Sequence, residues 1–469
     1  RSGITFSEEY RDMGFRSHVH GKPTIDINEA VDRRWRRFMG DGAAYNYIAM
    51  EQAIADSGLT ENEVSSERTA LIMGSGGPST SNQVKAADIA RQGNPKKVGP
   101  FMVPRAMSST NSATLATPFK IKGLSYSISS ACSTSAHCIG NGAELIQWGK
   151  NDVVFAGGGE ELHWSLSVLF DAMPALSSGY NDTPKKASRA FDANRDGFVI
   201  AGGGGVVVLE ELEHAKARGA KIYAELAGYA ATSDGYDMVQ PSGEGAVRCM
   251  QMALEGIELP VDYINTHGTS TPKNRTTESH VFDEIARANG IKQWPVVAIK
   301  AFIGHSQGSA AGDQLASALG SFAHGLLPGI PTLDAVADDV YAERLRFFTT
   351  PQAFTADAAF INAKGFGGNN ATGVVLSPEV TERLLTKRHG SAAIEAWKGR
   401  REAVRANAAA YLAEADRGRY APRYQFGEAV LEGPELEIHA DRIHIPGYDH
   451  AVSLVADNPF GSLDEGTPS

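Results

Sequence analysis

The amino-acid sequence predicts an α/β fold in which a largely parallel sheet is covered by helices on both faces. Three observations predict it. Short runs rich in Val, Ile and other apolar residues end in small residues, as buried strands do. Segments with helical spacing of apolar residues separate these runs, and continuous apolar strands are typical of parallel sheets covered on both faces. The series also occurs twice in the same order, so we expect two similar α/β halves.

The first half contains four expected strands and one well-marked helix. Residues 132–149 follow the second strand and carry Ile139, Ala143 and Ile146 at helical spacing, with Gly149 as the expected stop. The strands are expected at residues 68–77, 125–131, 152–159 and 204–211.

The second half repeats this order of elements. Its strands are expected at residues 221–230, 261–268, 296–304 and 358–368. We therefore expect an N-terminal half at 1–215, a C-terminal half at 216–378 and an appended tail at 379–469.

The tail changes in character, because a long helix and a strand pair replace the alternating pattern. The helix is expected between Ser391 as N-cap and Gly418 as stop, and residues 435–447 alternate as a strand pair does. One stripe of this helix is apolar, comprising Ile394, Trp397, Val404, Ala408 and Tyr411.

Composition excludes several classes of protein. The 469 residues are 42% hydrophobic and 21% charged, and the net charge of −11 argues against bulk binding of nucleic acid. No apolar run is long enough to span a bilayer, and the N-terminus does not read as a signal peptide. Three cysteines, Cys132, Cys138 and Cys249, are too few for a disulfide framework. We expect a cytoplasmic protein that binds neither nucleic acid nor a membrane.

Cys132 is the first candidate for chemistry, because it follows an expected strand and opens an expected helix. A thiol at a helix N-terminus feels the positive end of the macrodipole, which predicts a lowered pKa and a reactive thiolate. An arbitrary cysteine is more often a buried structural residue, and Cys138, farther along the helix, fits that interpretation. The ends of strands in open α/β sheets are, however, where such folds place their sites.

Two histidines stand at the ends of two further expected strands. His267 follows one strand and His305 another, and a lone histidine in such a place is usually structural. Two of them, with a cysteine at the end of a third strand, form a less probable coincidence. Cys132 is then the candidate nucleophile, and the imidazoles are candidate hydrogen-bond donors or bases.

Two motifs suggest other chemistries. Residues 304–308, Gly-His-Ser-Gln-Gly, match the elbow on which some hydrolases carry a nucleophilic serine, here Ser306, although Ser306 could equally be one small residue of a closely packed helix. Residues 192–197 match the first half of a calcium loop, but Gly203 stands where the loop requires a carboxylate. We expect no metal site.

Four segments carry a family resemblance when taken together in their order. They are "SISSACSTSAHCIG" (127–140), "INTHGTSTP" (264–272), "AIKAFIGHSQGSAAG" (298–312) and "GFGGNN" (365–370). In order and spacing they resemble the β-ketoacyl-acyl-carrier-protein synthases, the condensing enzymes of fatty-acid and polyketide synthesis. The resemblance covers residues 2–376. It is closest to type I synthases in the first two-thirds and to long-tailed bacterial synthases in the last third.

The resemblance implies a thiolase-like fold, a five-layered core of two pseudo-symmetric halves, here with a C-terminal helical and strand appendage. It implies a homodimer. The usual first strand of the family is not found, so from the resemblance we expect a few dozen residues to be missing before Arg1.

Site residues carry over by position. The resemblance implies that Cys132 accepts the acyl group, that His267 and His305 complete the catalytic set, and that Lys300 and Glu278 accompany them. Ser306 is then only a neighbour of His305.

Further positions concern the substrate. Thr269 and Thr271 match the contacts to the phosphopantetheine arm, and Phe198 is assigned to substrate binding with them. Phe366 matches the gating phenylalanine, whose backbone N–H joins that of Cys132 in the oxyanion hole.

The implied reaction is decarboxylative condensation of an acyl thioester with malonyl-acyl-carrier protein in fatty-acid elongation. Loss of carbon dioxide supplies the carbanion, so no metal or redox cofactor is expected, and the substrates arrive on the phosphopantetheine of acyl carrier protein. Alternatives are a ketosynthase of polyketide or polyunsaturated-lipid synthesis, a non-catalytic chain-length partner, against which the complete set argues, and a serine hydrolase using Ser306.

Three substitutions depart from the family pattern, and four cations suggest the docking site. Asn274 and Arg275 replace a common Gly-Asp, and Lys364 replaces the first phenylalanine of F-G-F-G-G. Because acyl carrier proteins are acidic, a basic patch is expected near the entrance, consisting of Arg34, Arg37, Lys96 and Lys97.

Overall fold

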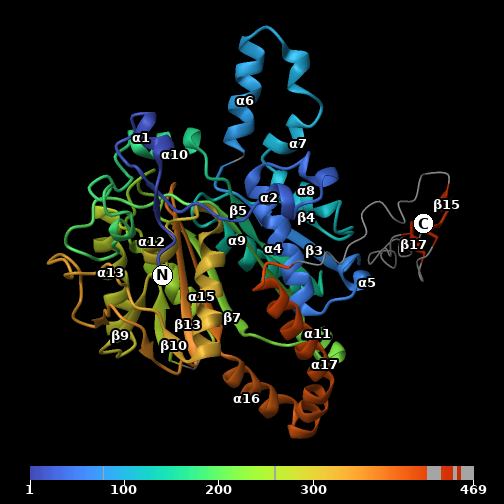
Figure 1. The fold of residues 1–469 in the computed structure, drawn as a ribbon. Helices are drawn as coiled ribbons and strands as arrows, with labels where there is room; N and C mark the ends of the chain where they lie inside the picture. Colours follow the sequence, from blue (N-terminus) through green and yellow to red (C-terminus); the bar gives the residue numbers. More distant parts are fainter. Residues whose placement is uncertain (78, 258–259, 420–434, 447–450, 456–469) are drawn as a thin grey trace, which may run out of the picture. The chain divides into compact units, whose positions relative to one another are not determined.

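The computed structural model describes residues 1–77, 79–257, 260–419, 435–446 and 451–455 (Figure 1). The chain divides into two compact units, residues 1–421 and 422–469. Within the described residues, no helix combines the length and apolarity needed to cross a bilayer.

The first sheet of the larger unit has four strands in the order β4-β3-β5-β6. They span Ser125–Tyr126 (β4), Thr69–Gly74 (β3), Val153–Glu160 (β5) and Gly203–Glu210 (β6). Strand β3 pairs in parallel with both β4 and β5, whereas β6 is antiparallel to β5. Strands β3 and β5 are buried along their whole lengths, as their continuous apolar sequences predict.

The second sheet has six strands in the order β11-β9-β8-β13-β14-β7. They span Leu345–Arg346 (β11), Trp294–Val297 (β9), Tyr263–Asn265 (β8), Ala358–Gly365 (β13), Asn369–Leu376 (β14) and Glu225–Ser233 (β7). The first four are mutually parallel, and β14 is antiparallel to both β13 and β7. One largely parallel sheet was expected, so the antiparallel pairings of β6, β7 and β14 correct that expectation. A strand that is buried on both faces has a continuous apolar sequence whether it pairs in parallel or antiparallel, so the sequence does not indicate the direction of pairing.

Helices form three further layers and confirm the five-layered α/β core. On one side, α4 (Asp41–Ser57) and α8 (Thr110–Ala116) contact the first sheet, and on the other, α12 (Glu244–Ala253) contacts the second and packs against α13 (Pro272–Ala288). Helices α9 (Thr134–Gln147) and α15 (Ala310–His324) contact each other and strands of both sheets, so they form the middle layer (Figure 1). The close approach needs glycine: a Cβ at Gly140 of α9 would lie 2.0 Å from the ring of Tyr229.

Six of the eight expected strands end earlier than predicted, and the two largest differences bear on the site. The strand expected at 125–131 ends at Tyr126, because the chain then turns and the backbone N–H of Ser130 bonds the hydroxyl of Thr134 at 2.9 Å. The strand expected at 296–304 ends at Val297, and Lys300 opens the one-turn helix α14 (Lys300–Ile303) instead of standing on a strand.

Short elements connect the layers. They are β1 (Thr5–Phe6), α1 (Glu8–Asp12), β2 (Val19–His20), α2 (Ile27–Ala30), α3 (Arg33–Arg36), α5 (Glu61–Val64), α6 (Thr80–Arg91), η1 (Pro95–Val98), α7 (Met102–Ala106), α10 (Trp164–Ala172), η2 (Pro184–Lys186), α11 (Leu212–Arg218), η3 (Gln307–Ser309), β10 (Leu326–Leu327) and β12 (Gln352–Ala353).

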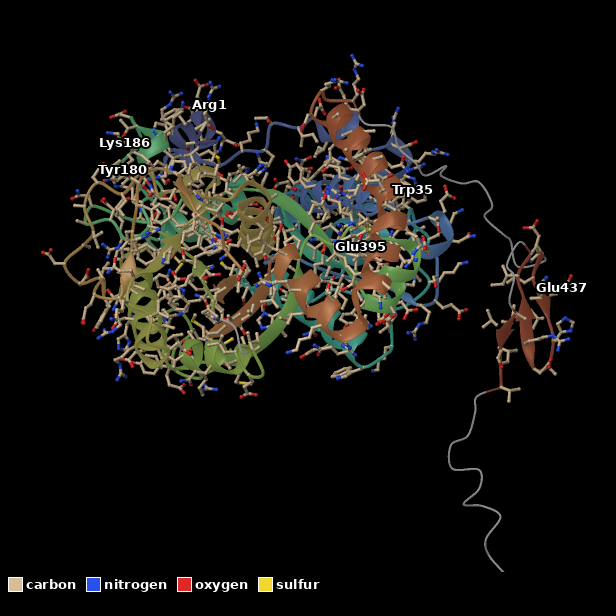
Figure 2. The ribbon with its side chains drawn as sticks, turned by 90° about the horizontal axis from the view of Figure 1, so that it is seen from below. Arg1, Trp35, Tyr180, Lys186, Glu395 and Glu437 are labelled. Carbon is tan, nitrogen blue, oxygen red and sulfur yellow. The ribbon has the colours of Figure 1, made fainter. Side chains whose placement is uncertain are left out.

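Two helices beyond residue 378 belong to the larger unit. Helix α16 (Pro378–His389) leads into α17 (Ser391–Ala415), on which Figure 2 labels Glu395. The expected apolar stripe is confirmed, because Ile394, Trp397 and Ala408 are buried where α17 packs on α4 and α11. The Trp397 indole donates to the carbonyl of Ala220 at 3.3 Å. Ser391 is the first helical residue rather than the N-cap, which is Gly390.

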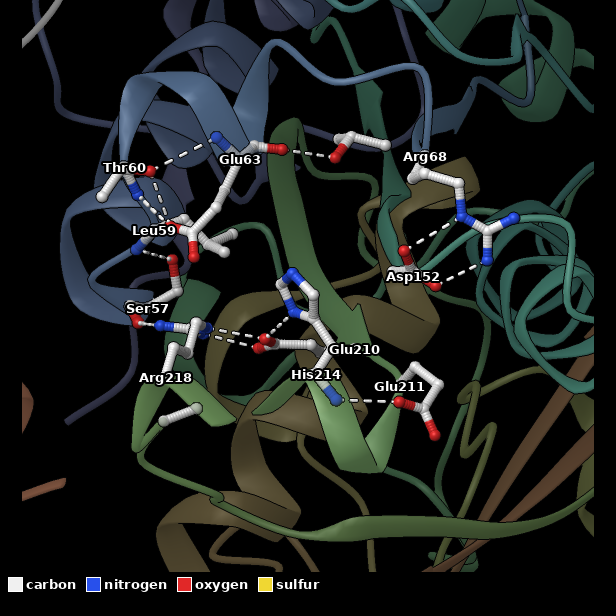
Figure 3. Close-up of polar contacts among 12 residues, drawn as sticks. Ser57, Leu59, Thr60, Glu63, Arg68, Asp152, Glu210, Glu211, His214 and Arg218 are labelled. Carbon is white, nitrogen blue, oxygen red and sulfur yellow. Dashed lines mark hydrogen bonds and ion pairs between the residues drawn. The ribbon is translucent and has the colours of Figure 1, made fainter. Parts of the chain in front are cut away.

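A polar network at the end of β6 connects this strand to α11 and to the end of α4 (Figure 3). The Glu210 carboxylate accepts from the Arg218 guanidinium at 2.5 and 2.6 Å and lies 2.6 Å from Nδ1 of His214. Arg218 also donates to the carbonyl of Ser57 at 2.8 Å, the last residue of α4. The bidentate pairing fixes α11 to the end of β6.

The smaller unit contains an antiparallel sheet of three strands, β15 (Glu437–Ile438), β16 (Arg442–His444) and β17 (Val452–Ser453). The expected strand pair is confirmed by β15 and β16, and β17 was not predicted.

Candidate active site

Cys132 lies in a tight turn between β4 and α9. Ala131 before it has the left-handed φ of 51°, and the Ala131 carbonyl accepts from the backbone N–H of Thr134 at 3.2 Å. Helix α9 begins at Thr134 with Ser133 as N-cap, so the cysteine stands just before the helix, as predicted. A strained residue at this point turns the thiol out of the strand direction.

His267 is held by the carboxylate of Glu278. The strand β8 ends at Asn265, and Glu278 of α13 accepts from the backbone N–H groups of His267 at 2.7 Å and Gly268 at 2.9 Å. Two side-chain amides, Asn274 at 2.8 Å and Asn362 at 2.9 Å, donate to the same carboxylate. Asn274, one of the departures from the family pattern, therefore contributes to the clamp that fixes the His267 loop.

His305 is held by backbone pairing with a distant segment. Its N–H donates to the carbonyl of Val199 at 2.7 Å, and its carbonyl accepts from the N–H of Ala201 at 2.9 Å. Its ring lies edge-on to that of His267 with 5.1 Å between centroids, and Phe198 packs on it at 5.4 Å. Both imidazoles are buried, with exposed fractions of 5% for His267 and 2% for His305.

The structure brings Cys132 to the same place. Its Sγ lies 3.8 Å from Oε1 of Gln307, which follows His305 by two residues. The ammonium of Lys300 is the common neighbour, because its charge lowers the pKa values of Cys132, His267 and His305 alike. The three predicted residues therefore share one site.

Both imidazoles are neutral. Burial, and after it the charge of Lys300, holds the pKa values of His267 and His305 well below the ordinary 6.5. Among the described residues, Nδ1 of His267 and both ring nitrogens of His305 have no hydrogen-bond partner. Neutral buried imidazoles with unpaired nitrogens are suited to donate hydrogen bonds to a bound substrate.

The prediction of a lowered thiol pKa at Cys132 is wrong for the free protein. Burial raises the pKa of this thiol to about 12, and the opposing effect of the Lys300 charge is smaller. Removal from water disfavours the thiolate by more than the nearby positive charge favours it. The resting side chain is a protonated thiol.

Among the described residues, Ser306 has no imidazole as a hydrogen-bond partner. Its hydroxyl donates to the carboxylate of Asp313, and its exposed fraction is 3%. Burial raises the pKa of Asp313 to about 6. A buried serine bonded to a carboxylate, without an imidazole partner, has the geometry of a structural residue.

Phe366 lies in the turn between β13 and β14, against the Cys132 turn. A Cβ at the preceding Gly365 would lie 2.3 Å from the carbonyl of Ser130, which shows how closely the two turns approach. Phe170, which the sequence did not indicate, lies between two other rings. Its ring centroid is 6.1 Å from that of Phe366 and 5.4 Å from that of Phe198. An aromatic series thus runs from the half-exposed Phe366 to His305.

The remaining substrate residues lie at the start of α13. The hydroxyls of Thr269 and Thr271 are 3.1 Å apart, and Thr271 is the N-cap of the helix. Lys364 is buried on β13, and its charge contributes to the lowered pKa of His267.

The four expected docking cations lie outside this site. Lys96 and Lys97 are exposed on η1, between α6 and α7, which extend away from the sheets in Figure 1. Arg37 contacts the ring of Phe101 at 5.5 Å, close to η1 in sequence, whereas Arg34 pairs with Asp32 at 3.2 Å.

Lys300 makes the stability of the protein depend on pH. Burial lowers its pKa from 10.5 to about 8, partly offset by the carboxylates of Glu278 and Asp313. Between these two values the unfolded chain binds a proton that the folded chain does not, so the free energy of unfolding rises with pH there. We expect Lys300→Met to be more stable than the parent near pH 7 and this advantage to shrink by about 3 kcal/mol toward about pH 10. Chemical denaturation across this range measures it, and a pH-independent difference would contradict it.

The core and the site together define a class. A thiol at a strand–helix turn and two neutral imidazoles at neighbouring turns of a five-layered α/β core are typical of thiolase-like condensing enzymes. Family models agree: residues 24–215 match the β-ketoacyl synthase N-terminal domain and residues 223–334 the β-ketoacyl synthase C-terminal domain. The chain belongs to the β-ketoacyl synthase family.

Curated relatives show the same family. The chain is 54% identical over 374 residues to 3-oxoacyl-[acyl-carrier-protein] synthase 1 of Escherichia coli K12, which covers 79% of this chain and 91% of that protein. The Haemophilus influenzae protein of the same name is 51% identical over the same shares.

One solved structure is similar to this chain over more of its length than the curated relatives are, including part of residues 379–469. The ketosynthase FabY of Pseudomonas aeruginosa superimposes with a TM-score of 0.86 and 32% identity, covering 96% of this chain and 74% of that one. A β-ketoacyl synthase of Burkholderia phymatum gives a TM-score of 0.75 and 29% identity over 80% of this chain and 92% of that one.

Proposed function

We propose that this protein condenses an acyl thioester with malonyl-acyl-carrier protein, releasing carbon dioxide and forming 3-oxoacyl-acyl-carrier protein in fatty-acid elongation. The observation that carries it is the pair of neutral imidazoles, His267 and His305, whose rings lie 5.1 Å apart beside the Cys132 turn with unpaired nitrogens. Membership of the family supports the same activity.

The first step is transfer of the acyl group to Cys132. The thiol sulfur attacks the carrier thioester, and the proton that leaves Cys132 ends on the departing carrier thiol. The backbone N–H groups of Cys132 and Phe366 stabilise the tetrahedral oxyanion, a role that the contact between their two turns supports.

The second step creates and uses a carbanion. His267 and His305 donate hydrogen bonds to the thioester carbonyl of the malonyl group, where negative charge develops as carbon dioxide leaves. The carbanion then attacks the acyl carbonyl on Cys132, so a carbon–carbon bond forms, the carbon–sulfur bond to Cys132 breaks, and the released thiolate takes a proton from water to restore the thiol. This sequence needs no metal or redox cofactor, since decarboxylation supplies the electron pair.

The other site residues orient these groups. Glu278 fixes the His267 loop through two backbone bonds. Lys300 adds to burial in lowering the pKa values of both imidazoles. Thr269 and Thr271 are proposed to contact the phosphopantetheine arm, and Phe198 to line the acyl site.

The direct test supplies purified protein with malonyl-acyl-carrier protein and acyl carriers of several lengths. Mass spectrometry is expected to detect a 3-oxoacyl carrier two carbons longer than the donor. Decarboxylation without an elongated product, or no reaction with any donor, would contradict the proposed function.

Acidic carrier protein is proposed to dock at Arg34, Arg37, Lys96 and Lys97. We expect the double reversal Arg37→Glu with Lys97→Glu to raise the KM for the acyl carrier about tenfold at low salt with little change in kcat, because rim charges steer association. High salt should shrink the difference. Lys292→Glu, an exposed lysine between α13 and β9, is the control. If Lys292→Glu raised the KM as much as the double variant, the proposed docking site would be contradicted.

Three further proposals concern the oligomeric state, the cellular location and the boundary between the halves. A homodimer is supported by the edge strand β4, whose Tyr126 is 37% exposed and whose preceding residue Leu124 is 44% exposed. Light scattering that finds a monomer at micromolar concentration would contradict it. A cytoplasmic location is supported by three cysteines that are all free. The halves are proposed to meet at residues 215/216, which lies between the two matched family domains.

A further inference from the structure

Glu160, the last residue of β5, lies where three chain segments meet below the site. Its side chain is 1% exposed, and its carboxylate accepts four hydrogen bonds. Three come from the loop after β3: the Ser75 hydroxyl at 2.8 Å and the backbone N–H groups of Gly76 at 2.6 Å and Gly77 at 3.3 Å. The fourth comes from the backbone N–H of Gly308 at 3.2 Å. One carboxylate therefore joins the first half to the turn that contains His305.

The backbone segments around Glu160 are packed too closely for a side chain at Gly158 or Gly308. A Cβ at Gly308 would lie 2.4 Å from the backbone nitrogen of Gly76, and one at Gly158 would lie 2.7 Å from the carbonyl of Gly308. The loop after β3 also touches the Cys132 turn, because the Ser129 hydroxyl donates to the carbonyl of Ser75 at 2.8 Å. The backbones thus approach as closely as glycine allows.

The position of Gly308 determines that of the residues beside the thiol. Gln307 before it has a φ of 52° and places its Oε1 3.8 Å from Sγ of Cys132. The other end of the turn is fixed by the backbone bonds of His305 to Val199 and Ala201. Glu160 is the side chain that holds the Gly308 end.

We propose that Glu160 is a positioning residue, whose carboxylate seats the His305–Gly308 turn against the Cys132 turn and places a negative charge beneath the nucleophile. The charge has a measurable consequence, because it adds to burial in raising the pKa of the Cys132 thiol. Burial raises the pKa of Glu160 itself to about 7, so the carboxylate is largely ionised at about pH 8. Only the condensation readout below rests on the proposed function.

Glu160→Gln separates the two effects, because it keeps the shape while it removes the charge and turns amide hydrogens toward the donors. We expect condensation to fall about tenfold or more. Alkylation of Cys132 by iodoacetamide at about pH 8 should instead become about threefold faster or more, since the thiolate is easier to form. If the variant lost activity only because its fold was disturbed, a glutamine at another buried glutamate should have the same effect.

Glu161→Gln is the matched control. Glu161 is also buried, at 4% exposed, and its carboxylate accepts bonds from Ser79, Thr80 and Ser81 without reaching the site. Both rates are expected to stay within about twofold of the parent in this variant. Alkylation that is unchanged or slower in Glu160→Gln, or equal effects in the two variants, overturns the proposal.

Glu160→Asp provides the second test if the glutamine variant does not fold by circular dichroism. It keeps the charge but shortens the reach by one methylene, so condensation should fall while alkylation keeps the parent rate. Full condensation activity in this variant overturns the positioning role. If the parent itself does not condense, the proposed function fails, and the alkylation comparison still tests Glu160.

Discussion

Cys132→Ala is expected to abolish condensation, with a loss of about 10⁴-fold or more, because it removes the thiol that is proposed to take the acyl group. Incubation with an acyl carrier should add an acyl mass to the parent protein and none to the variant. Decarboxylation of the malonyl carrier should continue in the variant, since the two imidazoles remain in place. Mass spectrometry and a carbon dioxide assay measure the two results separately.

Two control variants make this prediction specific. Cys138→Ala removes a fully buried thiol of α9 and should leave acylation intact. Ser306→Ala should also retain condensation, although the loss of its bond to Asp313 is expected to cost about 1–3 kcal/mol of stability. Acylation that survives in Cys132→Ala but disappears in Ser306→Ala would reinstate the serine nucleophile.

Replacement of either His267 or His305 by alanine is expected to slow malonyl decarboxylation about 10²- to 10³-fold, the usual effect of removing one donor from a developing anion. Both imidazoles are neutral donors, because burial holds their pKa values well below 6.5. An amide donor should recover part of the rate, so His305→Gln is expected to lose less than His305→Ala.

The alkylation rate of Cys132 and a distant histidine provide the controls. His324→Ala, at the exposed end of α15, should leave decarboxylation unchanged. If iodoacetamide still modifies Cys132 in the two site variants, the Cys132 turn is intact and the lost rate reports the missing donor. Decarboxylation at the parent rate in both variants would exclude the imidazoles from the reaction.

Local patterns predicted most of what carries the chemistry. The runs that became β4, β8 and β13 place Cys132, His267 and Phe366 after the ends of strands, and the motif at 298–312 places His305. These are features of a few adjacent residues, so the sequence indicates them directly. Strand β14 was not recognised, because its apolar run follows the glycine turn without a helix and reads as part of a loop.

Contacts between distant residues could not be predicted in the same way. The four donors around Glu278 come from 267–274 and from Asn362, and those around Glu160 come from two segments 85 and 148 residues away. Phe170 and Gln307 likewise gain their place only through the packing of separate elements.

The sequence by itself determined the α/β class, the order of the elements and the identity of the thiol and the two imidazoles, because these follow from local periodicity and short motifs. Only the tertiary structure decided the protonation of those groups. A helix N-terminus favours a thiolate at Cys132, but burial of the thiol raises its pKa to about 12. Burial depends on every surrounding segment at once, and no single stretch of sequence specifies it.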